Sequence, residues 1–299
     1  MQEEQQGTDV VELCRGEAGW PVGLATIEVE PARLWLRGRL ELIQATHCVA
    51  IVGSRAPTPY GSAQAERFGR ELSAAGVCVV SGLARGVDSA AHTGALDAGG
   101  ASVGVLGCGV DRPWPEGRLA DRMAEEGLLV SEFPPGTSPR RHHFPLRNRI
   151  IAGLSDAVLV VEAAEASGSL ITARWAADQG QQVFVIPGRI DHPMARGTLA
   201  LIREGGTPVG SPQMLLDDLY GAGEWRQGSE GESALGGAPS ASRSPLEASV
   251  LQALTGETMT AAEVATKVQR GVKEALGALT TLELGGAVRR APGGLYHLA

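Results

Sequence analysis

The chain has 299 residues, of which 43% are hydrophobic, and a formal net charge of −8. This length is enough for one large α/β domain and a smaller second domain. The negative charge argues against a protein that coats duplex DNA. It leaves room for a local cationic groove, because phosphate binding depends on charges within a Debye length of about 8 Å. The sequence has no run of about 18 uncharged apolar residues and no secretory pattern at its start, so we expect a cytosolic protein without a membrane partner.

The predicted elements begin with a lead-in segment, residues 1–43, to which the sequence assigns no role. Within it, WLRGRLELI predicts a short strand or helix. Between residues 44 and 220, short β-branched runs alternate with alanine-rich helical stretches. The runs are HCVAIV (47–52), VCVV (77–80), SVGVLG (102–107), LLVSE (128–132), AVLVVE (157–162) and QVFVIP (182–187). Parallel strands covered on both faces have such nearly continuous apolar sequences, so the pattern predicts an α/β fold with a doubly wound, Rossmann-like parallel sheet.

The remaining residues predict a linker and a second domain. Residues 221–244 are rich in glycine and serine and poor in large apolar side chains, which predicts a flexible linker. Residues 245–299 contain three short helical patterns and two β runs around a Pro-Gly-Gly turn, an order that predicts a small winged-helix domain. This domain carries five lysine or arginine residues and five glutamates. The balance does not support DNA recognition, so double-stranded DNA and a protein contact both stay open for it.

Three strand ends of the large domain carry small residues where a helix is expected to begin. They are Gly53, Ser54 and Arg55 after the first run, Ser81 and Gly82 after the second, and Ser167, Gly168 and Ser169 before LITARWAA. Such turns meet at the carboxyl edge of a doubly wound sheet, where glycine lets a ligand approach the backbone and helix N-termini favour anions. Each turn alone is compatible with ordinary turn chemistry. Together they predict a phosphate-binding rim, although neither GxGxxG nor GxxxxGK[ST] is present.

The stretch RRHHFPLRNR, residues 140–149, concentrates positive charge in this acidic chain. Its prolines predict a loop that carries Arg140, Arg141 and Phe144, followed by a helix over LRNRIIAGLSD. Cations near a helix N-terminus oppose the macrodipole, which indicates an anionic partner. Phe144 can be a core residue or a platform for an unpaired base. Because single strands are held by cationic tracks with aromatic platforms, the combination favours single-stranded nucleic acid.

No catalytic residues are predicted. The sequence has no Ser-His-Asp order, no HExxH motif and no paired carboxylates at plausible strand ends. Glu132 and Glu162 close two strands, and helix capping and salt bridging are their favoured roles. Asp88 is expected to cap the helix DSAAHTGALDAG, and His92 is expected to be structural. The four cysteines stand singly, which favours buried thiols over a metal site, and no cofactor is expected.

Five segments in unbroken order resemble the DNA processing protein A (DprA/Smf) family. They are VAIVGSRAPTPYG, VVSGLARGVDSAAH, VSEFPPGTSPRRHHFPLRNRIIAGLSDAVLVVEA, SGSLITA and VFVIPG. The resemblance implies an extended Rossmann fold and a homodimer. It also implies that the protein binds and protects single-stranded DNA and loads the RecA recombinase onto incoming strands during natural transformation and recombination.

The same resemblance implies which residues contact DNA. It assigns phosphate binding to Gly53, Ser54 and Arg55, pairs Arg141 with Phe144, and adds Asn148, Arg149 and the turn Ser167, Gly168 and Ser169. The family usually has a lysine where this chain has Arg141, so the charge is kept and the geometry changes. Trp114 stands where tyrosine is common in the family. The N-terminal region looks too short for the helical domain that many relatives carry.

Two function classes follow for the same sheet edge. The leading hypothesis is a non-catalytic single-strand binder. The rival is an enzyme, because nucleotide phosphoribohydrolases of the lysine-decarboxylase-like type carry PGGxGTxxE at this edge. Here Thr172 of SGSLIT stands at the position of that glutamate, and a hydroxyl group replaces a carboxyl group poorly in acid–base chemistry. A nicotinamide-dependent oxidoreductase is disfavoured because its dinucleotide fingerprint is missing.

Overall fold

The computed structural model describes residues 10–221, 245–254, 258–284, 287–291 and 295–298. Contacts divide the chain into two compact units, Met1–Ser233 and Ala234–Ala299. Each unit has a hydrophobic core of its own. The segment predicted as a flexible linker lies, apart from Gly221, outside the described residues. No helix in the described ranges is both long and apolar enough to cross a membrane.

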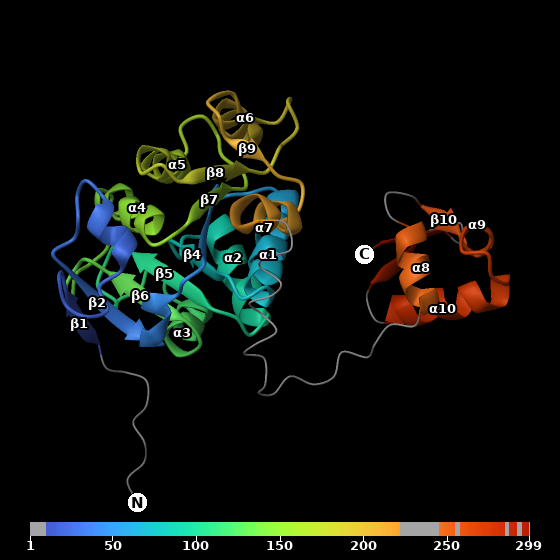
Figure 1. Cartoon of the computed structure of the whole chain (residues 1–299), viewed down its shortest axis with the longest axis horizontal. Coiled ribbons are helices and arrows are strands. Elements are labelled where there is room, and N and C mark those ends of the chain that lie inside the picture. Colours follow the sequence, from blue (N-terminus) through green and yellow to red (C-terminus); the bar gives the residue numbers. More distant parts are fainter. Residues whose placement is uncertain (1–9, 222–244, 255–257, 285–286, 292–294, 299) are drawn as a thin grey trace, which may run out of the picture. The chain divides into compact units, whose positions relative to one another are not determined.

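The first unit is built on a nine-stranded sheet with the order β1-β2-β6-β5-β4-β3-β7-β8-β9 (Figure 1). The strands are β1 Val11–Cys14, β2 Arg33–Gly38, β3 Cys48–Val52, β4 Cys78–Ser81, β5 Ser102–Leu106, β6 Leu128–Ser131, β7 Ala157–Val160, β8 Gln182–Val185 and β9 Thr207–Pro208. The six predicted runs are β3 to β8, and these strands pair only in parallel with one another. The prediction of a doubly wound α/β fold is confirmed.

The short strand or helix predicted within the N-terminal segment is a strand, β2, followed by the 3₁₀ segment η2 Leu40–Gln44. Residues 33–38 form a strand that pairs antiparallel with both β1 and β6, so the sheet is mixed at this edge. Within β2, the side chains of Leu34 and Leu36 are buried while Arg33 is exposed. This alternation is typical of a strand with one face on the core. The described part of the lead-in segment therefore belongs to the large unit, where it extends the sheet.

Helices cover both faces of the sheet (Figure 1). One face carries α1 Pro59–Ala74, α2 Val87–Asp97, α3 Arg118–Glu125 and α7 Pro212–Tyr220. The other face carries α4 His143–Gly153, α5 Ser169–Asp178 and α6 Arg196–Arg203, together with the short 3₁₀ segments η1 Val22–Thr26 and η2 Leu40–Gln44. A third 3₁₀ segment, η3 Pro193–Ala195, directly precedes α6. In β3, Val49 and Ile51 pack toward the α1 side, whereas Ala50 and Val52 pack toward the α4 side. Burial of both faces explains why these strands read as unbroken apolar runs.

The strand order fixes where a ligand can enter. The chain builds outward from β3 through β4 and β5 to β6, and then returns to the other side of β3 with β7. The loops that follow β3 and β7 thus diverge to opposite faces of the sheet and leave a crevice at their carboxyl ends, which is the usual ligand position in this fold.

The second unit confirms the predicted winged-helix order. It contains α8 Pro245–Ala253, β10 Met259–Thr260, α9 Ala261–Lys267, α10 Val272–Leu284, β11 Val288–Ala291 and β12 Leu295–Leu298. The strands form an antiparallel sheet in the order β10-β12-β11. Thr260 and Glu263 form a capping box at the start of α9.

Helices α1 and α2 pack through two glycines, and this contact yields a stability prediction. A Cβ on Gly69 would collide with the carbonyl oxygen of Ala91, and a Cβ on Gly94 would collide with that of Glu66. We expect Gly69→Ala and Gly94→Ala each to lower the free energy of unfolding by about 1–3 kcal/mol, even though alanine favours an isolated helix by about 1 kcal/mol. Urea denaturation followed by circular dichroism measures this change. Gln64→Ala, on α1 like Gly69, is the control. Unchanged stability of both glycine variants would contradict the close crossing of the two helices.

Candidate nucleic-acid-binding site

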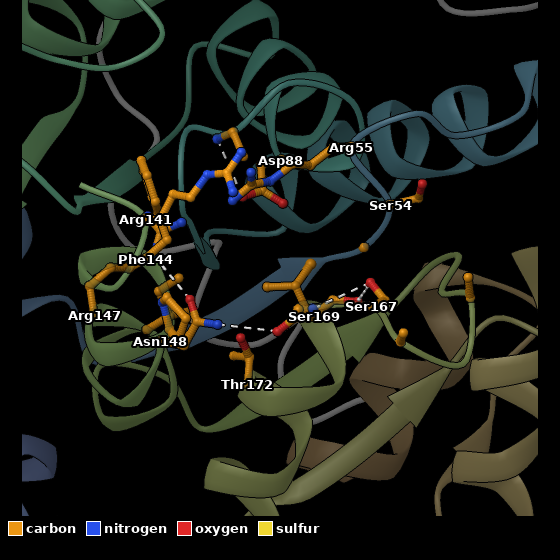
Figure 2. Close-up of a pocket in the computed structure, with 18 of the residues that line it drawn as sticks. Ser54, Arg55, Asp88, Arg141, Phe144, Arg147, Asn148, Ser167, Ser169 and Thr172 are labelled. Carbon is orange, nitrogen blue, oxygen red and sulfur yellow. Dashed lines mark hydrogen bonds between the residues drawn. The ribbon is translucent and has the colours of Figure 1, made fainter. Parts of the chain in front are cut away.

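A cavity of about 690 Å³ lies at the carboxyl edge of the sheet, between the segments that follow β3 and β7 (Figure 2). It is the crevice expected from the strand order. Nine of the eleven residues predicted to bind DNA line this cavity: Gly53, Ser54, Arg55, Arg141, Phe144, Asn148, Ser167, Gly168 and Ser169. The structure therefore brings together side chains that are more than 100 positions apart in the sequence.

One face of α4 forms a wall of the cavity. The helix begins at His143, so Phe144 lies in its first turn and not on a loop as predicted. The side chains on this wall are Phe144, Arg147, Asn148 and Ile151. Their spacing of three, four and seven residues places them on one helical face. Arg147 was not among the residues predicted for the site, although this spacing from Phe144 was the signal that could have found it.

Arg55 and Phe144 contact each other across the cavity. The Arg55 guanidinium carbon lies 5.3 Å from the centroid of the Phe144 ring, within the range of a cation–π interaction. Behind the ring is Gly107, where an added Cβ would lie 3.1 Å from Phe144 Cδ1. No ion pair of Arg55 or Arg141 occurs among the described residues. Both charges therefore stay available to a ligand.

Arg147 is buried in the wall of the cavity and, together with Asn148, joins α4 to the turn after β4, to β5 and to the start of α5. Its guanidinium donates to the carbonyl oxygens of Gly82 (2.7 Å) and Val105 and to Asn148 Oδ1 (3.0 Å). The Asn148 amide in turn donates to the carbonyl oxygen of Gly168 (3.2 Å), just before α5. A Cβ on Gly82 would collide with the guanidinium, so this turn requires glycine for the close approach of the charge.

The cavity has an excess of positive charge. Three arginines and one aspartate line it. Burial raises the pKa of Asp88, against the lowering effect of the Arg147 charge. Burial also lowers the pKa of Arg147 to about 10; Asp88 opposes this shift, and the nearby charge of Arg55 adds to it. An anion that enters the cavity would relieve the repulsion between the two guanidinium groups.

Three of the helix N-termini at this edge, those of α1, α2 and α5, are not equivalent. At α1, the Glu162 carboxylate already accepts hydrogen bonds from the backbone N–H (2.8 Å) and hydroxyl (2.6 Å) of Thr58. After β4, the Asp88 carboxylate accepts from the N–H groups of Gly82 (3.1 Å) and Ala84 (3.4 Å). Asp88 lies within the first turn of α2, whose N-cap is Gly86, so the predicted N-cap role of Asp88 is wrong. Glu162 keeps the predicted capping role.

The N-terminus of α5, like that of α4, lines the cavity without an acid in its first turn, which the structure describes completely in both helices. Ser167 Oγ and Ser169 Oγ lie 2.7 Å apart, and the Ser169 backbone N–H points toward Ser167 Oγ at 3.4 Å. Thr172, one turn further, also lines the cavity (Figure 2). Hydroxyl groups at a helix N-terminus, opposite Arg55, form an arrangement that favours an anion.

Arg140 and Arg149 do not line the cavity. Arg140 is exposed on the loop before α4. The Arg149 side chain is only 3% exposed and forms two bonds to the Glu132 carboxylate, of 2.7 Å and 2.6 Å. It also donates to the carbonyl oxygens of Val29 and Leu146. The expectation that Arg149 belongs to the DNA-binding rim is therefore corrected: its charge is neutralised inside the protein, and Glu132 has the predicted salt-bridging role.

The chain is similar to known proteins over most of its length. A family model described as DNA recombination-mediator protein A matches residues 12–220, and one described as DprA winged helix domain matches residues 236–294. The chain is 40% identical over 282 residues to protein Smf of Escherichia coli K12, covering 93% of this chain and 74% of that protein. It is 43% identical over 202 residues to DNA processing protein DprA of Streptococcus pneumoniae R6, covering 67% of this chain and 71% of that protein. The chain belongs to the DprA/Smf family.

Solved structures of DprA proteins have the same fold. The X-ray structure of DprA from Streptococcus pneumoniae matches with a TM-score of 0.67 at 38% identity, covering 72% of this chain and 75% of that one. A structure of Helicobacter pylori DprA, which concerns its single-stranded DNA binding mode, matches with a TM-score of 0.64 at 30% identity, covering 71% of this chain and 98% of that one. The resemblance to the DprA family found in the sequence is confirmed.

The buried Arg149–Glu132 pair of this DprA-family chain can be tested separately from ligand binding. Arg149→Met leaves the Glu132 carboxylate without its partner, and breaking a buried pair costs about 3–5 kcal/mol. We expect a loss of unfolding free energy of that order in urea denaturation. The double variant Arg149→Met with Glu132→Gln should recover part of the loss, because no unpaired charge remains. A single variant as stable as the parent would contradict the structural role.

His92 predicts a pH dependence of stability. It is fully buried, its Nδ1 lies 2.7 Å from Ser102 Oγ, and burial together with the Arg147 charge lowers its pKa from 6.5 to about 3. Below pH 6.5 His92 binds a proton in the unfolded chain but not in the folded one. Its contribution to the free energy of unfolding is therefore fully present above pH 6.5 and decreases as the pH falls toward 3. Between pH 7 and pH 5 this group contributes a loss of about 2 kcal/mol.

The measurement is urea denaturation of the parent and of His92→Asn across that pH range. The variant should lose the contribution and show a shallower decrease. His142→Asn, at an exposed position before α4, is the matched control. Equal slopes for the parent and His92→Asn would show that His92 is protonated alike in both states.

Proposed function

We propose that the chain is a non-catalytic protein that binds single-stranded DNA at the cavity between β3 and β7. The observation that supports this most strongly is the group formed by Arg55, Arg141 and Phe144 beside the N-terminus of α5. Two unpaired guanidinium groups and a helix N-terminus suit phosphate, and an aromatic ring suits an unpaired base. A duplex keeps its base faces stacked, so the ring favours a single strand.

The finer part of the proposal rests on the family. We infer that the protein acts in the cytoplasm, protects incoming strands and delivers them to the RecA recombinase, as a homodimer. The matching family model is described as a recombination-mediator protein, and the Helicobacter pylori relative is described by its single-stranded DNA binding mode. Two subunits would bring two cavities to one strand and raise its avidity through effective concentration. Light scattering at micromolar concentration tests the dimer, and a purely monomeric mass would contradict it.

The hydrolase alternative has less support. The single carboxylate that lines the cavity, Asp88, is buried and bonded to two backbone N–H groups. Thr172 occupies the position expected for a catalytic glutamate and is also buried. Neither group is placed to act as a general acid or base on a ligand in the cavity. Release of free base from nucleoside monophosphates by the purified protein would revive this alternative.

The proposed binding site is tested by charge and ring removal. Arg55→Ala and Arg141→Ala should each weaken binding of oligothymidylate by about tenfold or more, since hydrogen bonds to charged groups contribute about 1.5–3 kcal/mol. Each removed arginine that binds a phosphate should make the slope of log affinity against log salt shallower by about 0.7. Phe144→Ala should weaken binding by about 1–3 kcal/mol with an unchanged salt slope, because it removes stacking and no charge. Fluorescence anisotropy over a salt series measures both quantities.

The matched control is Arg203→Ala. Arg203 is an exposed arginine at the C-terminal end of α6, which precedes the amino end of β9 and hence lies at the opposite edge of the sheet. This variant removes the same charge from the chain and should bind like the parent. Wild-type affinity and salt slope for Arg55→Ala and Arg141→Ala together would rule out the proposed site.

A further inference from the structure

The loop that follows β5 begins next to the cavity and carries an exposed tryptophan. Trp114 is 50% exposed and does not line the cavity itself. Its loop starts against the binding site, since Gly107 lies behind the Phe144 ring. Further along, residues 115–120 line a small hollow together with Leu83 and Ser89, next to the turn after β4. The loop therefore runs along the carboxyl edge of the sheet, away from Phe144.

This loop is held in place by its neighbours. The Cys108 thiol donates to the carbonyl oxygen of Arg112 (3.1 Å), and the Gly109 N–H donates to the carbonyl oxygen of Thr137 (2.9 Å). The Asp111 carboxylate accepts from the Gly136 N–H at 2.8 Å and 2.9 Å. The backbone that presents Trp114 is thus bonded to the loop before α4. An aromatic side chain on a fixed backbone loses little conformational freedom when a ligand stacks on it.

Exposed arginines lie on this loop and on the two segments that adjoin it. Arg112 lies two residues before Trp114, Arg85 is on the turn after β4, and Arg140 is on the loop before α4. Within the described ranges, none of these three forms an ion pair. Two acids lie on the tryptophan loop: Asp111, whose carboxylate is engaged by the Gly136 N–H, and Glu116. The edge keeps a surplus of unpaired guanidinium groups next to an exposed indole.

We propose that Trp114 is a second stacking platform for single-stranded DNA, reached by the strand after it leaves the cavity at Phe144. Arg85, Arg112 and Arg140 bind the phosphates of this extension. The inference rests on the proposed function and extends it, because it gives the strand a direction along the sheet edge and lengthens the site. Between Gly107 and Trp114 the chain can span at most about 25 Å, so the extension adds a few nucleotides to the site.

A protein partner is the other occupant that an exposed tryptophan can serve, since tryptophan and arginine are common at the centre of protein interfaces. The observations favour the strand. The loop starts at Gly107 behind the Phe144 platform, and it and its adjoining segments repeat the combination of an aromatic face and arginines without an ion pair among the described residues. Nucleic acid recognition without sequence readout uses such a repeated arrangement, because each base offers a face and each linkage offers a phosphate.

The test is a length series of oligothymidylates with the full chain. With an oligonucleotide of about four nucleotides, which fills only the cavity, Trp114→Ala should bind like the parent. With about twenty nucleotides, its affinity should fall by about 5- to 150-fold, the range expected for the loss of one stacked base. Trp114→Phe keeps a ring and should retain most of the affinity. Arg112→Ala should make the salt slope shallower for the long oligonucleotide only, and Arg203→Ala should change nothing.

Intrinsic fluorescence gives an independent measurement. Stacking of a base on the indole should quench the emission of the parent protein with long oligonucleotides, and Trp114→Phe should lose that part of the quenching. Thermal melts followed by circular dichroism establish that the variants fold like the parent.

The outcomes separate the two proposals. If Trp114→Ala and Arg112→Ala bind every length like the parent while Arg55→Ala and Phe144→Ala bind weakly, the second platform is wrong and the proposed function stands. If all four variants bind like the parent, the proposed function itself fails. Normal DNA binding by Trp114→Ala with a lost response of RecA assembly would assign the indole to a protein interface and overturn the platform.

Discussion

The arrangement of the site depends on how the buried guanidinium of Arg147 is satisfied. It donates to carbonyl oxygens at the end of β4 and in β5, and to Asn148, which in turn holds the residue before α5. A buried charge is costly unless it is paired and hydrogen bonded. The elements that carry Gly82, Phe144 and Ser169 are therefore fixed relative to one another by the need to satisfy one side chain. The hydrogen bonds of Arg147 thereby also determine where the exposed groups around the cavity lie.

The arginines before and within α4 fall into two groups with different roles. Arg147 and Arg149 turn inward and are compensated by backbone oxygens, by Asp88 nearby and by Glu132. Arg140 and Arg141 remain exposed. The positive charge available to a ligand thus comes from Arg141 together with Arg55, which arrives from the segment after β3. Such a local surplus of positive charge can attract phosphate although the chain has a net charge of −8, because salt makes the electrostatic interaction short-ranged.

The internal carboxylates decide which part of the edge is open to an anion. Glu162 occupies the start of α1 and Asp88 occupies the turn after β4, whereas α4 and α5 begin without an acid. The starts of α4, next to Arg141, and of α5 are thereby left open to an anion. Trp114 lies on the same edge, on a loop bonded to the segment before α4.

The sequence by itself determined the six central parallel strands, the winged-helix order and the three turns at one sheet edge. These features depend on local periodicity and on small residues at strand ends, which are visible within short windows. Only the tertiary structure decided that residues 33–38 complete the sheet, that Phe144 belongs to a helix and that Arg149 is buried. Arg149 meets Glu132 from 17 positions away, and Arg147 meets Gly82 from 65. Whether a charged side chain faces solvent or a partner depends on such distant groups, because burial of charge is set by the fold around it and not by its sequence neighbours.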